Sequence, residues 1–153
     1  MSAPTPPSDY HDALTGLPNR RLLEDRLKQA LYLAQRRDRG IALLLIELAG
    51  LPRFGDHALL EAARALQACV RKADTLARWG AAEFAVVVTD VQSEADCRQV
   101  AERLLRALDT DAAIGISIFP HDAGDPEALE RNADAARSRA RQTGGREYRL
   151  YAR

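Results

Sequence analysis

Two hydrophobic spacings alternate along the chain, and each predicts a different kind of secondary structure. Apolar residues three and four positions apart indicate amphipathic helices, whereas short, nearly continuous apolar runs indicate buried strands. Helices are expected over about 20–37, from Asp56 to about Val70, from Ser93 to about Leu108 and over about 126–142. Strands are expected at 41–48, 75–79, 83–89, 112–119 and 148–151.

Residues at the ends of these segments support the predicted boundaries. Asn19, Asp56 and Ser93 each stand where a helix should begin, and these residue types cap helix N-termini. The run Asp125-Pro126-Glu127 is a further helix start, since it combines a capping Asp with proline in the first turn. The order helix, strand, helix, strand, strand, helix, strand, helix, strand predicts an α+β fold, with one sheet of about five strands flanked by helices.

Length and composition fit one ordinary folded domain. The chain has 153 residues, of which 46% are hydrophobic and 29% charged, so extensive disorder is excluded. Basic and acidic residues number 22 each, and a net charge of zero gives no overall attraction to nucleic acid or to an acidic membrane. Only Lys28 and Lys72 are lysines, so arginine is common and any single arginine is weak support for a binding site.

The cysteines, histidines and N-terminal residues indicate no further site. Cys69 and Cys97 match neither a metal motif nor a disulfide framework, and the three histidines are scattered, which argues against zinc. Residues 1–10 contain three prolines and no apolar segment, so we expect a flexible tail before a domain spanning 11–153. The longest apolar run is far too short to cross a membrane, and a cytoplasmic location is expected.

Several short motifs resemble those of one known family. Residues 12–20 read D-A-L-T-G-L-P-N-R, which resembles the opening of GGDEF domains, the diguanylate cyclase family. Residues 78–84, R-W-G-A-A-E-F, stand where that family has R-x-G-G-D/E-E-F, and 133–141 contains matches to its A-D-x-A and A-K. The resemblance runs in order from Asp12 to Tyr151 and implies the palm-like fold of nucleotide cyclases and polymerases, with a mostly antiparallel sheet.

The resemblance implies a chemistry for which several residues of this chain are unsuited. Family members join two GTP molecules into cyclic di-GMP across a homodimer, using metal ions held by carboxylates. One of those carboxylates ends the first strand, where this chain has Glu47, and the other is the third motif residue, where it has Ala82. Ala82 offers no metal ligand, and the Cβ atom of Ala81 is expected to crowd a tight turn where the family has glycine.

The loop after the first strand is also shorter than in the family. The pattern D-x-D-x-F-K-x-x-N-D-x-x-G-H-x-x-G-D loses eight residues between Glu47 and Asp56, including the Asn that reads guanine. Asp56 matches the retained G-D, and Arg141 replaces the phosphate-contacting Lys. Together these departures predict a cyclase fold without cyclase activity, in which Glu47, Gly80 and Glu83 are remnants. No cofactor is expected, and Mg²⁺, held by Glu47 and Glu83, is needed only if GTP still binds.

A product-binding motif is better preserved than the catalytic one. Residues 71–74, R-K-A-D, match the family's inhibitory R-x-x-D motif, with the family's five-residue separation from Gly80. R-x-x-D occurs four times in this arginine-rich chain, so the register against Gly80 is the informative feature. Arg103 lies in A-E-R, which resembles the family element that completes this site. Because guanidinium groups hold phosphates and a carboxylate accepts guanine N–H groups, Arg71, Asp74 and Arg103 form the candidate cyclic di-GMP site.

The leading interpretation is a regulatory module that binds cyclic di-GMP, with GTP as a second candidate ligand and a homodimer or another signalling protein as candidate partners. A weak cyclase that uses Glu47 and Glu83 for metal, and a pure interaction domain, are the alternatives. If no ligand binds, Arg71 and Asp74 are an ion pair at a helix end, Arg103 is solvated, and both glutamates are charged strand ends.

The C-terminal segment is rich in arginine. Residues 131–153 hold seven arginines against Asp134 and Glu147, a net charge of +5. A polyphosphate or nucleic-acid surface is one interpretation. A solvated helix face is favoured instead, because no aromatic platform accompanies the arginines.

Overall fold

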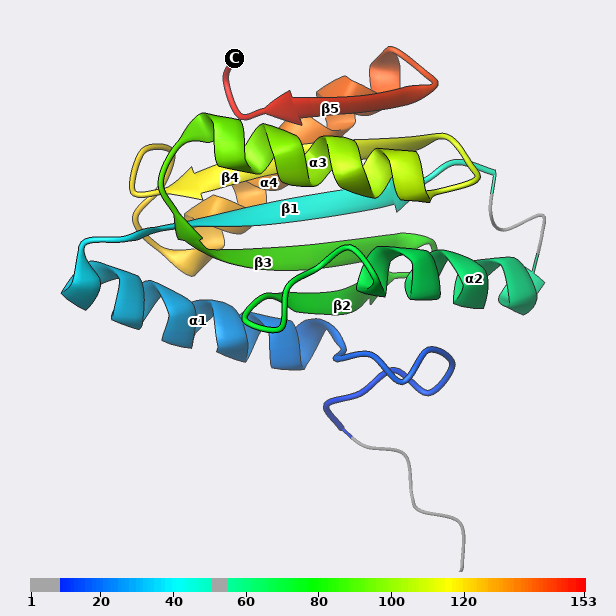
Figure 1. Cartoon of the computed structure of the whole chain (residues 1–153), viewed down its shortest axis with the longest axis horizontal. Helices are drawn as coiled ribbons and strands as arrows, with labels where there is room; N and C mark the ends of the chain where they lie inside the picture. The colour runs from blue at the N-terminus through cyan, green and yellow to red at the C-terminus, as the bar shows by residue number, and fades with distance from the viewer. Residues whose placement is uncertain (1–8, 51–54) are drawn as a thin grey trace, which may run out of the picture.

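The alternating helical and strand patterns form a five-stranded sheet covered by four helices in the part of the chain that the structure describes (Figure 1). The structure is a computed structural model, and it describes residues 9–50 and 55–153. Most of the expected N-terminal tail, and Arg53 of one R-x-x-D pattern, lie outside the described residues. The elements follow in the order α1 (Arg20–Arg37), β1 (Gly40–Leu48), α2 (Gly55–Gln67), β2 (Thr75–Gly80), β3 (Glu83–Val91), α3 (Glu94–Ala107), β4 (Ala112–Phe119), α4 (Pro126–Gln142) and β5 (Arg146–Leu150).

The sheet has the mostly antiparallel α+β arrangement that the sequence predicts. Its strand order is β2-β3-β1-β4-β5. The β2–β3, β3–β1 and β1–β4 pairs are antiparallel, and only β4 and β5 run parallel. The last strand begins at Arg146, two residues before its predicted start, because α4 ends at Gln142 and the turn that follows uses the left-handed Gly144 and Gly145.

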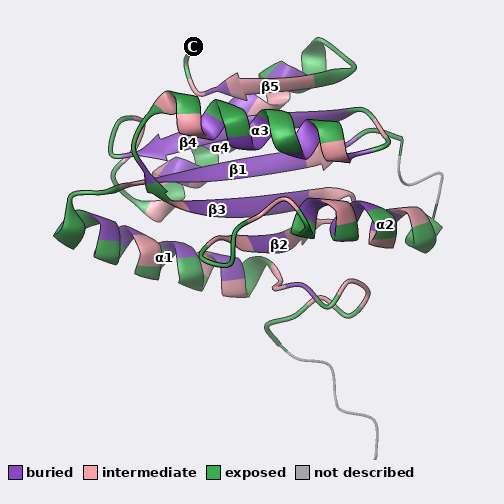
Figure 2. Ribbon diagram, viewed as in Figure 1, coloured by how far each residue is buried: buried purple, intermediate pink, exposed green. Residues whose placement is uncertain are grey.

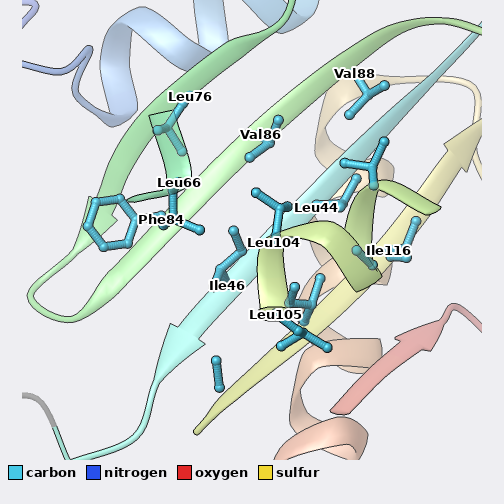
Figure 3. Close-up of a cluster of buried hydrophobic side chains, with 14 of the residues drawn as sticks. Leu44, Ile46, Leu66, Leu76, Phe84, Val86, Val88, Leu104, Leu105 and Ile116 are labelled. Atoms are coloured by element: carbon cyan, nitrogen blue, oxygen red, sulfur yellow. The ribbon is translucent and has the colours of Figure 1, made fainter. Parts of the chain in front are cut away.

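The central strand β1 is buried on both faces, as its apolar run predicts (Figure 2). Leu44 and Ile46 point into one hydrophobic cluster, which α2 and α3 cover with residues such as Leu66 and Leu104 (Figure 3). Leu43 and Leu45 alternate with them and join the opposite cluster, which α1 and α4 cover. The sheet therefore lies between two helical layers, and both ends of β1 reach the rim of the sheet.

The helix starts follow their predicted caps with one exception. The Asn19 side chain accepts the backbone N–H of Leu22 at 3.0 Å, and Ser93 forms a capping box with Asp96. Asp56 was predicted as the cap of the second helix, and this is wrong. Since α2 already includes Gly55, Asp56 lies in its first turn, where its charge interacts favourably with the helix dipole.

Helix α4 packs unusually close to β4, and one glycine makes this possible. A Cβ atom built on Gly115 would lie 2.1 Å from the carbonyl oxygen of Ala133 and 2.2 Å from the backbone nitrogen of Arg137. The backbone of α4 therefore rests directly on that strand, next to β1.

Among the described residues, no helix is long and apolar enough to span a membrane.

Candidate functional site

The β2–β3 hairpin, which carries residues 78–84 of the GGDEF-like motif, is tied to the N-terminal turn by Arg78. Its Nη1 atom lies 3.1 Å from Asp12 Oδ1, while Nε and Nη2 donate to the carbonyl oxygens of Gly80 and Ala81 at 3.2 and 2.8 Å. Burial opposes ionisation of Asp12, but hydrogen bonds from Thr15 and the charge of Arg78 outweigh it and lower the pKa of Asp12. The first and second family motifs thus form one structural unit.

The hairpin accommodates both alanines of the altered motif without backbone strain. Neither Ala81 nor Ala82 is among the described non-glycine residues with positive φ, and Ala81 is exposed. The expected crowding at Ala81 is therefore wrong, because this turn does not need glycine. Ala82 accepts the backbone N–H of Leu48 at 2.9 Å, which fastens the hairpin to the end of β1, and Gly80 pairs with Glu83 at the base of the turn.

Glu47 and Glu83, two of the three expected remnants of the catalytic site, line a cavity of about 540 Å³ at this rim of the sheet, whereas Gly80 does not. Glu47 on β1 lies directly opposite Glu83 on β3 in the strand register. Both line the cavity with Ala82 and with Arg137 and Arg141 of α4. We call this the catalytic edge. The structure thus brings Glu47, Glu83 and Arg141 together, as the family resemblance implies.

Asp56, which was also expected at the nucleotide site, does not join this group. It is exposed in the first turn of α2 and does not line the cavity of the catalytic edge. The shortened loop, part of which lies outside the described residues, leads into α2 at that point.

Glu47 is bound by two arginines, so it is not the solvated strand end considered as an alternative. Its Oε1 atom accepts a hydrogen bond from Arg137, and its Oε2 atom lies 2.9 Å from Nη1 of Arg141. Arg137 is further held by Asp134, whose Oδ1 accepts from Nη2 at 2.8 Å. Burial, followed by the charge of Arg141, lowers the pKa of Arg137, although a guanidinium remains charged at any ordinary pH.

Arg137 is the important site residue that the sequence did not reveal. It directly follows Ala133-Asp134-Ala135-Ala136, so the family pattern A-D-x-A-L-Y has an apolar Leu at its position. Ala133, Ala136 and Ala140 form the buried stripe of α4, and Arg137 lies beside that stripe. A charged residue at this apolar family position was the available signal, and it needed an acidic partner across the helix–sheet contact to be interpreted.

The donor set at the catalytic edge does not fit the metal that the family uses. Glu47 Oε1 already accepts a hydrogen bond from Arg137, its Oε2 is ion-paired with Arg141, and the side chain of Ala82 has no donor atom. No group of three His, Cys, Asp or Glu side chains within 9–50 and 55–153 is arranged to hold a metal ion. Mg²⁺ in nucleotide sites is held by one or two carboxylates together with waters and substrate phosphates. With Glu47 paired to two arginines and no carboxylate at Ala82, neither family ligand position is available to it.

A second cavity, of about 350 Å³, lies between the end of β3 and α3 and contains the predicted product-binding arginines. Arg71 and Arg103 both line it, together with Asp90, Asp96 and Gln99. We call it the R-x-x-D pocket. Two arginines that are far apart in the sequence therefore share one concave surface.

Asp74, which was expected to accept guanine N–H groups, instead lies buried behind Arg71 and does not line the pocket. Its oxygens accept Nε and Nη2 of Arg71 at 3.2 and 3.1 Å and the backbone N–H of Thr89 at 3.1 Å. Arg71 also donates to the carbonyl oxygen of Thr89 at 2.6 Å. The hydrogen bond with Asp74, more than the charges of Asp90 and Asp96, raises the pKa of Arg71 despite its partial burial. The ion pair considered as an alternative is thus present, with Arg71 facing the pocket.

The arginines of the C-terminal segment do not form an open basic surface. Five of them pair with carboxylates: Arg137 and Arg141 with Glu47, Arg146 with Asp111, Arg149 with Glu147, and Arg153 with Glu94 and Asp122. This internal neutralisation favours the solvated-face interpretation over a polyphosphate or nucleic-acid surface.

Comparison with known proteins agrees with this geometry. A family model for the diguanylate cyclase GGDEF domain matches residues 9–147. The chain belongs to the GGDEF family. It is 38% identical over 157 residues to the bifunctional diguanylate cyclase/cyclic di-GMP phosphodiesterase MucR of Pseudomonas aeruginosa, an alignment covering 90% of this chain and 23% of MucR. It is 31% identical to the diguanylate cyclase TpbB of the same species, across 83% of this chain and 34% of TpbB.

Solved structures confirm the fold of this GGDEF chain. The isolated GGDEF domain of TpbB superposes with a TM-score of 0.87 at 31% identity, covering 92% of this chain and 94% of that one. A sensory box/GGDEF family protein from Caulobacter crescentus gives 0.82 at 32% identity, covering 88% of this chain and 99% of that one. The chain spans only 23% of the length of MucR and 34% of the length of TpbB.

Proposed function

We propose that this chain is a catalytically degenerate GGDEF domain that binds cyclic di-GMP as a regulatory module through the R-x-x-D pocket. The observation that carries the proposal is the placement of Arg71 and Arg103 on one concave surface, with Asp74 buried behind Arg71. The family to which the chain belongs works in cyclic di-GMP signalling, and MucR and TpbB are named for that chemistry.

The pocket suits a ligand that combines phosphates with guanine bases. Arg71 and Arg103 provide two guanidinium groups for phosphate oxygens and for stacking on a base. Asp74 fixes the direction of Arg71, since it holds two of the nitrogens of that fork. Because the Asp74 oxygens already accept N–H groups, the exposed Asp90, which lines the same pocket, is the proposed acceptor for guanine N1–H and N2–H.

Calorimetric titration with cyclic di-GMP tests the proposal. Arg71→Ala and Arg103→Ala should each weaken binding by roughly 30- to 150-fold, the loss expected when one charge-assisted fork of 2–3 kcal/mol is removed. Arg106→Ala is the matched control, because Arg106 is exposed on the same helix as Arg103, begins another R-x-x-D pattern and does not line the pocket. It should change the affinity less than about twofold.

Other outcomes of the titration support other functions. Equal losses for Arg71→Ala, Arg103→Ala and Arg106→Ala would indicate nonspecific attraction of an anion, which also fades steeply with salt. Absence of cyclic di-GMP binding would favour the alternative in which the chain is a pure interaction domain. Binding of GTP with Mg²⁺ accompanied by turnover would restore the weak cyclase.

A further inference from the structure

The position of Arg137 suggests what has replaced the metal ion at the catalytic edge. In the family, carboxylates at this rim of the sheet hold metal ions against the triphosphate. Here the guanidinium of Arg137 binds the Glu47 carboxylate directly, and Arg141 binds its other oxygen. A cation therefore still neutralises Glu47, but it is a covalent part of α4.

The close packing of α4 on β4 fixes this cation in place. Gly115 leaves no room for a side chain beneath Ala133 and Arg137, so the helix backbone rests on the sheet and Arg137 extends towards β1. Its side chain is only 13% exposed, and Asp134 on the preceding turn holds Nη2 at 2.8 Å. A guanidinium held by two carboxylates and by helix packing is not free to move aside for an incoming ion.

We infer that Arg137 is an internal counter-ion that closes the catalytic edge to divalent metal ions, in addition to the loss of the carboxylate at Ala82. A metal ion at Glu47 would have to displace the hydrogen bond from Arg137 and the ion pair with Arg141. It would also come to rest beside the positive charge of Arg137, which repels it. Restoring the missing carboxylate alone is then insufficient to rebuild the metal site.

Binding of Mn²⁺, followed by electron paramagnetic resonance of the free ion, tests this inference without any need for activity. Mn²⁺ prefers the same oxygen ligands as Mg²⁺ and gives a direct signal. The variant Ala82→Asp should not bind Mn²⁺ measurably at the edge. The double variant Ala82→Asp/Arg137→Leu should bind at least about tenfold more tightly, because a neighbouring positive charge is removed.

The control is Ala82→Asp/Arg139→Leu, which removes an arginine from the exposed side of the same helix. It changes the net charge equally, and it should bind Mn²⁺ no better than Ala82→Asp. A gain of equal size in both double variants, or tight binding by Ala82→Asp alone, would overturn the inference. Circular dichroism should show folded proteins, and Arg137→Gln in place of Leu should give the same gain if Leu perturbs the packing.

Discussion

Arginine and carboxylate side chains meet at both the catalytic edge and the R-x-x-D pocket, but the two pairs differ in burial. Both partners are largely buried in the Arg137–Glu47 pair, whereas only the carboxylate is buried in the Arg71–Asp74 pair. At the catalytic edge, Arg137 is 13% exposed and Glu47 18%, so cation and anion bury each other. In the R-x-x-D pocket, Asp74 is 2% exposed while Arg71 is 53% exposed. A buried anion beneath an exposed cation leaves that cation available to a phosphate, whereas a buried cation on a buried anion does not.

On the proposed function, this contrast explains how one fold can lose its catalytic site and keep a binding site. The catalytic edge needs uncompensated carboxylates, because only these attract metal ions. The product site needs oriented arginines, and a supporting carboxylate orients Arg71 without blocking its outer side. We propose that the same residue types oppose metal binding at the catalytic edge and favour ligand binding in the R-x-x-D pocket.

The largest expected effect is the absence of cyclase turnover. Protein incubated with GTP and Mg²⁺ or Mn²⁺ should form no cyclic di-GMP detectable by chromatography, since loss of a metal carboxylate typically lowers rates by orders of magnitude. Restoring Ala81→Gly and Ala82→Asp together should not rescue activity, because Arg137 still binds Glu47 and the loop before Asp56 remains short. Multiple-turnover product that Glu83→Ala abolishes would show that the catalytic edge is functional.

The next largest effect concerns the packing of α4 on β4, which positions Arg137 at the catalytic edge. Gly115→Ala places a Cβ atom 2.1 Å from the carbonyl oxygen of Ala133, so α4 must move away from β4. We expect a loss of at least about 3 kcal/mol in unfolding free energy by urea denaturation. Gly124→Ala is the control, since a Cβ atom there meets nothing within 4 Å, and it should change stability by less than about 0.5 kcal/mol. Equal stability of both variants would contradict the close packing.

Asp74→Asn tests the R-x-x-D pocket, because two explanations of the pocket predict opposite changes in its affinity for cyclic di-GMP. If the pocket were only a positive patch, removing a negative charge would strengthen cyclic di-GMP binding. Because Asp74 orients Arg71 through two hydrogen bonds, we expect binding to weaken by roughly tenfold in calorimetry instead. Tighter binding after Asp74→Asn would reduce the pocket to an unspecific anion site.

Short-range sequence preferences predicted most of the fold, because in this chain they agree with one another. The nearly unbroken apolar run of β1, the Asn19, Ser93 and Asp125 caps and the hairpin around Gly80 all follow from short-range preferences. The start of α2 was missed by one residue, since Gly55 precedes Asp56 without signalling a helix. The features that the sequence did not predict are contacts between residues far apart in the chain.

The candidate sites were predictable only as far as the motifs reach. The register against Gly80 found Arg71 and Asp74, but only the structure shows that Asp74 faces inward to Thr89. Arg137 was missed because its partner, Glu47, is 90 residues away and nothing local marks the contact. Long-range ion pairs depend on how α4 settles on the sheet, and a single glycine sets that distance.

Glu130 offers a third carboxylate against which the catalytic edge can be compared. Glu47 has two bound guanidinium groups, whereas the nearest cation to Glu130 is Arg20, with Nη2 4.0 Å from Oε1. Burial, followed by the neighbouring Glu24 carboxylate, raises the pKa of Glu130 to about 7. A partly buried carboxylate without a close cation is thus held in its protonated form at mildly acidic pH.

The smallest effect we predict is a pH-dependent gain from Glu130→Gln. Because folding raises the pKa of Glu130 from 4.5 to about 7, the folded state binds more protons between these values and loses stability as pH rises through them. Gln imitates the protonated form, so the variant should be more stable by about 1 kcal/mol at pH 8, a shift of a few degrees in Tm, and unchanged near pH 4. The exposed Glu127→Gln on the same helix should show a much smaller gain, because the charge of Glu127 makes only a minor contribution to the raised pKa of Glu130. A gain in stability from Glu130→Gln that is equal at pH 4 and pH 8 would mean that packing, and not removal of a buried charge, stabilises the variant.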